Sequence, residues 1–125
     1  MVYRRTTLSL SPLIKSNSQF IKSIASARSQ ERRKHLLRAA TRDQLLTLVE
    51  IALNLLRSRI PIRANQKSRL QPAAVAIRRF SRVRSEKAAR KILLESELQQ
   101  QQGKGPTAIA GLVSKLLLPF LVDLL

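Results

Sequence analysis

A run of basic side chains between residues 78 and 91 is the part of the sequence best suited to bind a ligand. It holds seven cations in fourteen residues: Arg78, Arg79, Arg82, Arg84, Lys87, Arg90 and Lys91. Three further cations precede it: Arg63, Lys67 and Arg69. Cations that neutralise several phosphates release condensed counterions, which gives strong, salt-dependent binding with little sequence preference. We therefore predict that these ten residues bind nucleic acid. The run also resembles a nuclear import patch.

The excess of positive charge supports this prediction. The chain has 24 Lys+Arg against 7 Asp+Glu, a formal net charge of +17 over 125 residues. Residues 61–91 hold ten basic residues and one acidic residue, whereas residues 92–125 hold two basic and three acidic residues. Arginine outnumbers lysine by 16 to 8, and its planar fork of donors matches phosphate oxygens. The alternative is a merely solvated surface, but self-repulsion of this size destabilises a compact chain unless a polyanion neutralises it.

No arrangement of residues indicates catalysis. The sequence has no Cys, which excludes disulfides, cysteine-ligated zinc and thiol catalysis. Its one histidine, His35, lies in a basic run, and Glu95 and Glu97 are two residues apart and diverge on a helix. The three glycines form no phosphate-binding loop: Gly103, Gly105 and Gly111. We therefore predict a non-enzymatic protein that holds no metal or cofactor.

The spacing of apolar residues predicts an all-α fold of three to four short amphipathic helices. Thr41 and Gln44 form a capping-box pattern, so helices are expected at about 31–40 and 42–59, the second ended by Pro61. A short helix from Pro72 to Phe80 and a helix capped by Ser85 should follow, the latter ending near 99–102. Residues 31–102 would thus form a small basic helical domain. Its marginal core suggests that nucleic acid, another partner or a second copy completes it.

The first thirty residues are predicted to be a disordered basic arm. They contain seven Ser, two Thr and five basic residues, and no acidic residue. This composition is also typical of a mitochondrial transit peptide, which the mature protein would lose. Both interpretations of residues 1–30 stay open at this point.

An apolar tail, residues 107–125, follows the Gly/Pro break at residues 103–106. Eight apolar side chains fall on one helical stripe: Ile109, Leu112, Val113, Leu116, Leu117, Phe120, Leu121 and Leu124. Lys115, Pro119 and Asp123 argue against a membrane-spanning helix. We predict that the stripe contacts a membrane interface or a groove on a partner. The alternative is that the tail folds back onto the helix at 42–59 and completes the core.

The order of these features resembles a family of small basic proteins encoded by adintoviruses and Maverick/Polinton-like elements of invertebrates. The resemblance covers about residues 34–125, and the blocks that carry it are His35-Leu36-Leu37, an A-x-x-x-Q-L stretch from Ala40, Leu48 to Leu56, Ile60-Pro61-Ile62, Gln66-Lys67, Leu70 and Lys91 to Leu94. That family is loosely similar to the adenovirus core-protein precursor pre-mu. The resemblance implies a DNA-condensing component of a virion that acts in the host nucleus.

The same resemblance implies a processing site at Gly103, Lys104 and Gly105. The sequence from Gln101 to Gly105 is similar to the relaxed adenoviral protease pattern, with cleavage between Lys104 and Gly105. Cleavage there would separate the basic body from the apolar tail. A flexible linker is the alternative.

Three functional hypotheses follow from the sequence. The first is a sequence-independent nucleic-acid-binding protein, with double-stranded DNA as the expected partner and a minor viral core protein as the expected role. The second is a membrane-active or membrane-associated protein that uses the apolar tail. The third is a mitochondrial nucleoid or ribosomal component with a cleaved transit peptide.

Overall fold

A computed structural model describes residues 11–57, 64, 68, 71–101 and 108–122. These residues contain seven α-helices, a short 3₁₀ helix and no strand, so the predicted all-α class is confirmed for the described part. The elements are α1 Pro12–Ser16, α2 Ser18–Ser26, α3 Gln30–Ala39, α4 Arg42–Leu56, η1 Gln71–Ala73, α6 Ala74–Ser81, α7 Glu86–Gln101 and α8 Ile109–Val122. The helices are more numerous than the three to four that we expected, mainly because helices also form before residue 30.

Helix α4 begins where the sequence predicts. The Thr41 hydroxyl accepts a hydrogen bond from the Gln44 N–H at 3.2 Å, and the Thr41 N–H donates to the Gln44 side-chain oxygen at 2.9 Å. These two bonds form the capping box. The wide apolar arc of α4 is covered from several sides, since α1, α6, α7 and α8 all pack against it. This explains why its apolar surface exceeds what a surface helix needs.

Residues 12–26 differ from the expected disordered arm, because they form α1 and α2. Ser11 caps α1 by accepting a hydrogen bond from the Ile14 N–H at 3.2 Å, and its hydroxyl donates to the Glu50 carboxylate of α4. Ile14, Ile21 and Ile24 are fully buried. Burying an Ile side chain contributes about 1.5–3 kcal/mol. Tertiary contacts therefore order a segment whose many serines favour neither helix nor core. Residues 1–10 lie outside the described part.

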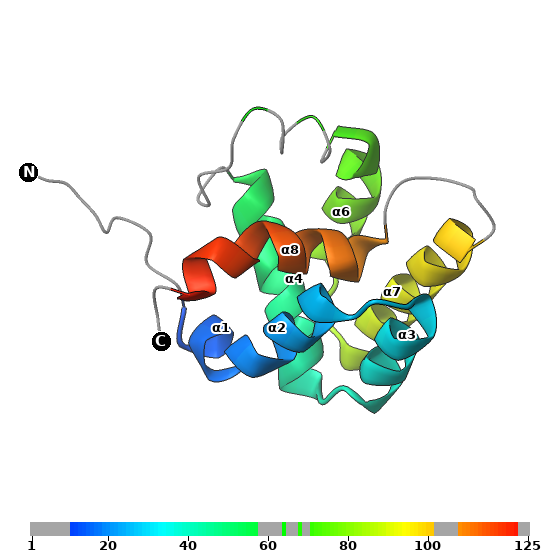
Figure 1. Ribbon diagram of the computed structural model, residues 1–125. Coiled ribbons are helices and arrows are strands. Elements are labelled where there is room, and N and C mark those ends of the chain that lie inside the picture. The colour runs from blue at the N-terminus through cyan, green and yellow to red at the C-terminus, as the bar shows by residue number, and fades with distance from the viewer. Residues whose placement is uncertain (1–10, 58–63, 65–67, 69–70, 102–107, 123–125) are drawn as a thin grey trace, which may run out of the picture.

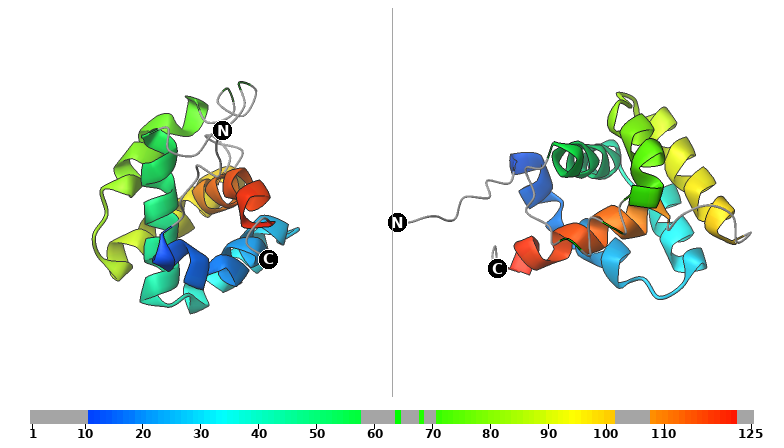
Figure 2. Two further views of the ribbon diagram at one scale, coloured as in Figure 1. Left: turned by 90° about the vertical axis from the view of Figure 1, so that its left-hand side faces the viewer. Right: turned by 90° about the horizontal axis from the view of Figure 1, so that it is seen from above.

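Helix α8 crosses the middle of the molecule and packs against α2, α4 and α7. The right view of Figure 2 shows α8 between α2 and α4, whereas α1 packs directly against α4. Five residues of the apolar stripe are buried there: Ile109, Leu112, Val113, Leu116 and Leu117. This is the arrangement in which the tail folds back, with α2 as an additional neighbour. No helix in the described residues is long and apolar enough to cross a membrane.

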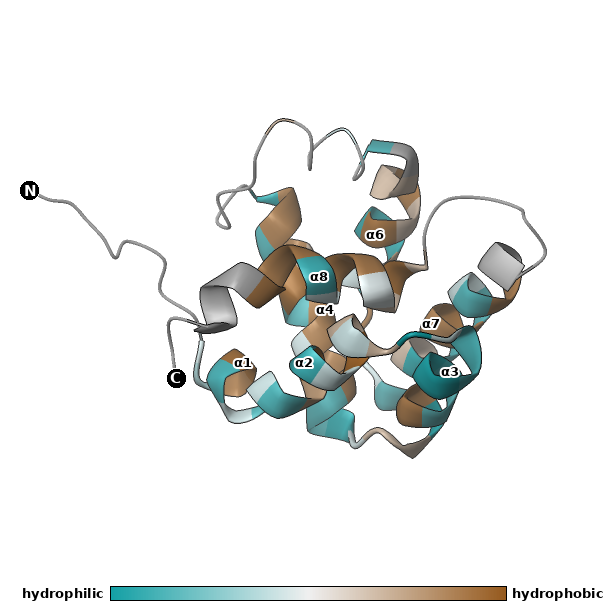
Figure 3. Ribbon diagram, in the orientation of Figure 1, coloured by the Kyte–Doolittle hydropathy of each residue, from teal (hydrophilic) through white to brown (hydrophobic). Residues whose placement is uncertain are grey.

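The hydrophobic core is continuous and is centred on α4 and α8. Figure 3 shows hydrophobic residues concentrated on these two helices, while α3 is mostly hydrophilic. Phe80 and Ile77 of α6, Leu93 of α7 and Leu37 of α3 reach the same core and are fully buried. As a result, α3, α6 and α7 each keep an outward face for polar and charged side chains.

Candidate nucleic-acid interface

The predicted basic run lies on α6, on the turn at residues 82–85 and on the first turns of α7. On α6, Ile77 and Phe80 point into the core, which leaves Arg78 and Arg79 exposed. Ser85 caps α7, since its hydroxyl accepts a hydrogen bond from the Ala88 N–H at 3.2 Å. The predicted cap is thus confirmed. In the left view of Figure 2, the turn between α6 and α7 lies at the outer edge of the molecule.

Six cations of this run are exposed, and we call them the α6–α7 basic edge: Arg78, Arg79, Arg82, Arg84, Lys87 and Lys91. Within the residues that the structure describes, none of the six makes an ion pair with an acidic side chain. Lys87 and Lys91 are four residues apart on α7 and therefore lie on the same face. The only acid in this stretch, Glu86, pairs with Arg90 at 3.0 Å. The edge is thus a cluster of like charges without internal neutralisation.

Arg90 differs from the other predicted phosphate ligands because its guanidinium already has partners within the protein. Its Nη2 donates to the Ala40 carbonyl at 2.7 Å and to the Glu86 carboxylate at 3.0 Å, and its Nε donates to the Leu37 carbonyl at 3.3 Å. The Leu37 and Ala40 carbonyls lie at the C-terminal end of α3, where a cation also interacts favourably with the helix dipole. Arg90 therefore joins α7 to α3, a role that the sequence does not reveal.

The remaining predicted site residues fall into two groups. The cations Arg63, Lys67 and Arg69, the break at Gly103, Lys104 and Gly105, and Leu124 lie outside the described residues. The side chains of Phe120 and Leu121 are likewise not described. The other five residues of the apolar stripe lie in the core.

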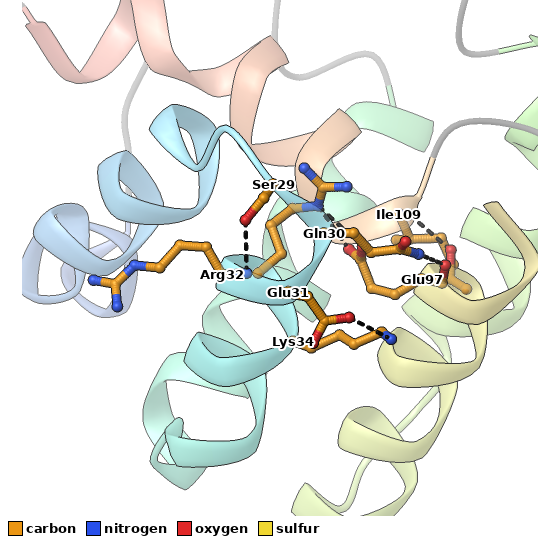
Figure 4. A network of polar contacts seen from close by, with 9 residues as sticks. Ser29, Gln30, Glu31, Arg32, Lys34, Glu97 and Ile109 are labelled. Atoms are coloured by element: carbon orange, nitrogen blue, oxygen red, sulfur yellow. Dashed lines mark hydrogen bonds and ion pairs between the residues drawn. The ribbon is translucent and has the colours of Figure 1, made fainter. Parts of the chain in front are cut away.

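A second polar cluster joins α3, α7 and α8 (Figure 4). Arg33 pairs with Glu97 at 3.0 Å, and the Gln30 side chain donates to the Glu97 backbone carbonyl. The Ile109 N–H, at the start of α8, donates to the Ser96 hydroxyl at 2.9 Å. Glu97 is fully buried. Sequence reasoning missed this cluster because Gln30 and Arg33 lie more than sixty residues from Glu97 along the chain.

Burial raises the pKa of the Glu97 carboxyl above its usual value of 4.5. The loss of hydration outweighs Arg33 and Lys34, which lower the same pKa. Arg33 and Lys34 also make ion pairs, with Glu97 and Glu31 respectively. These two cations belong to the fold and contribute little to an outer basic surface.

The described residues contain no group of three or more His, Cys, Asp or Glu side chains placed to bind a metal ion. His35 is exposed. Comparison of the chain with protein-family models, with curated proteins and with solved structures found no match. The function is therefore inferred from the residues of this chain and their placement.

Proposed function

We propose that the protein binds nucleic acid without sequence preference, through the α6–α7 basic edge. The observation that carries this proposal is the set of six exposed cations, within fourteen residues, that make no ion pair in the described part of the chain. Holding these charges together costs energy through mutual repulsion. A phosphate backbone removes that cost and gains entropy from the release of its counterions. Arg side chains, four of the six, add bidentate hydrogen bonds to phosphate oxygens.

Double-stranded nucleic acid fits this surface better than a single strand. Proteins that bind single strands combine a basic groove with aromatic side chains on which bases stack. The two aromatic side chains that the structure describes, Phe20 and Phe80, are both buried. The described surface therefore offers cations for the phosphate backbone but no stacking platform.

The biological role within this proposal comes from the resemblance to adintoviral basic proteins. It suggests a minor core protein that condenses viral DNA in the host nucleus and in the virion. The membrane hypothesis needs the apolar stripe to be accessible, whereas five of its residues are buried here. The mitochondrial hypothesis needs residues 1–30 to be removable, which would delete α1 and α2 with their buried isoleucines. Neither alternative gains support from an observed feature.

The test is the salt dependence of binding to a mixed-sequence DNA duplex, followed by fluorescence anisotropy. Six phosphate contacts predict a slope of about −5 for the logarithm of affinity against the logarithm of salt concentration. A variant with glutamine at all six positions of the edge should lose most of that slope.

The matched control replaces six other cations by glutamine: Lys15, Lys22, Arg28, Arg32, Arg57 and Lys115. Both variants lower the net charge by six, so they differ mainly in where the charge is removed. The control should keep most of the wild-type slope. Binding that is independent of salt, or equal losses in the two variants, would overturn the proposal.

A further inference from the structure

Helices α3 and α7 run in opposite directions and are joined at both ends. At one end Gln30 and Arg33 of α3 contact Glu97 of α7. At the other end the Arg90 guanidinium of α7 contacts the carbonyls of Leu37 and Ala40. The start of α7 is therefore fixed against the short junction between α3 and α4, although fifty residues separate the two in sequence.

Two exposed cations flank the point where Arg90 meets this junction. Arg38 and Arg42 each lie two residues from Ala40, whose carbonyl is 2.7 Å from the Arg90 guanidinium. On α7, Lys87 and Lys91 lie within one turn of Arg90. Two separate segments thus carry exposed cations within three residues of the contact between Arg90 and Ala40.

We propose that Arg38 and Arg42 belong to the same nucleic-acid-binding surface as the α6–α7 basic edge, and that Arg90 is the positioning residue that joins the two parts. This inference rests on the proposed function and extends it to a composite surface. Its partner is double-stranded. Cations in a single run can follow one phosphate backbone, whereas cations on two elements can contact both strands of a duplex, which carries one charge per about 1.7 Å of axis.

The first experiment measures the salt slope of duplex binding for the double variant R38Q/R42Q. Loss of two phosphate contacts should reduce the magnitude of the slope by about 1.8. The matched control is R28Q/R32Q, which removes two exposed arginines at the opposite end of α3. The control should change the slope by much less. An R38Q/R42Q slope equal to that of the control overturns the composite surface.

The second experiment tests the positioning role of Arg90 with the variant R90K. Lysine keeps the charge but lacks the planar fork that holds both carbonyls and Glu86. If Arg90 positions the junction, R90K reduces the slope in the wild-type background and has no further effect when added to R38Q/R42Q. If Arg90 instead acts only through its charge, R90K keeps the wild-type slope and the positioning role is wrong.

Two checks separate the possible failures. Circular dichroism on R90K establishes that it is folded at the assay temperature, and the R38Q/R42Q comparison decides the composite surface even if R90K unfolds. If the binding affinity of the wild-type protein does not depend on salt, both the proposed function and this inference are wrong. If the wild-type slope depends on the α6–α7 basic edge, but R38Q/R42Q changes it no more than R28Q/R32Q does, only this inference is wrong.

Discussion

Arg33 and Glu97 bring opposite charges together where water does not reach the carboxylate. Glu97 is fully buried, and the Arg33 side chain is only 13% exposed. Removing a carboxylate from water costs several kcal/mol, which its attraction to a nearby cation repays only in part. The raised pKa of Glu97 shows that the loss of hydration is the larger effect, because the protonated form needs less solvation than the carboxylate. The pair thus fixes how α3 and α7 meet, at some cost in stability near neutral pH.

This balance predicts how stability depends on pH. Because the pKa of Glu97 is raised above 4.5 in the folded protein, the native state binds this proton more tightly than the unfolded chain. Protonation of Glu97 therefore stabilises the folded protein fully below pH 4.5, and this stabilisation is lost as pH rises from 4.5 through the folded-state pKa. Glu97→Gln mimics the protonated form at every pH. The free energy of unfolding of the wild type, relative to Glu97→Gln, should therefore fall across this window and then level off.

Urea unfolding of both proteins between about pH 4 and pH 8 measures this difference, at about 1.4 kcal/mol for each unit of pKa shift. Glu95→Gln is the matched control, since Glu95 lies on the same helix and is exposed. The free energy of unfolding of the wild type, relative to Glu95→Gln, should not fall over this pH range. A wild-type advantage that instead grows with pH would mean that the Arg33 ion pair outweighs burial.

At the scale of elements, α8 is the helix whose surroundings matter most for function. The five described side chains of its apolar stripe are buried, and so are Gly111 and Ser114 on its more polar side, while Lys115 is exposed. In the described structure, these residues of α8 are part of the core. The chain would have to separate α8 from α2 and α4 before these five side chains could meet a membrane.

Adjacent leucines on α8 offer a direct test of this packing. Leu117 is fully buried, whereas Leu118 is only partly buried. Leu117→Ala should lower the free energy of unfolding by about 2–5 kcal/mol, because it removes buried methyl groups and leaves a cavity. Leu118→Ala makes the same chemical change and should cost clearly less. Small and equal losses in chemical denaturation would show that α8 does not belong to the core.

The elements also show what the sequence could and could not predict. Thr41 with Gln44, and Ser85, mark the starts of α4 and α7 correctly, because capping depends on neighbours within three residues. The order of α1 and α2 depends on burial of Ile14, Ile21 and Ile24 against distant elements, which local composition does not express. The roles of Arg90 and Glu97 likewise depend on partners fifty or more residues away. In the sequence, Arg90 is indistinguishable from the exposed arginines of the basic edge.

For the whole molecule, the decisive property is a net charge of +17 carried on a small helical core. Acidic side chains neutralise little of it, since the ion pairs in the described part of the chain involve only Arg33, Lys34 and Arg90. Self-repulsion therefore opposes the compact state. Screening by salt and neutralisation by a polyanion both relieve it, but they compete, because salt weakens binding to the polyanion.

This competition predicts that salt and DNA each raise the melting temperature when applied alone, and that the two effects do not add. Without nucleic acid, added salt should raise the melting temperature as repulsion is screened. At low salt, duplex DNA at about a hundredfold above its dissociation constant should stabilise the fold by about 2.7 kcal/mol, which corresponds to a rise of roughly 10 °C. The rise should vanish as salt increases.

In the variant with glutamine at the six edge positions, the melting temperature without DNA at low salt should be higher than in the wild type, and the DNA-induced rise should be nearly absent. An equal DNA-induced rise in that variant, measured by thermal unfolding, would locate binding away from the α6–α7 basic edge.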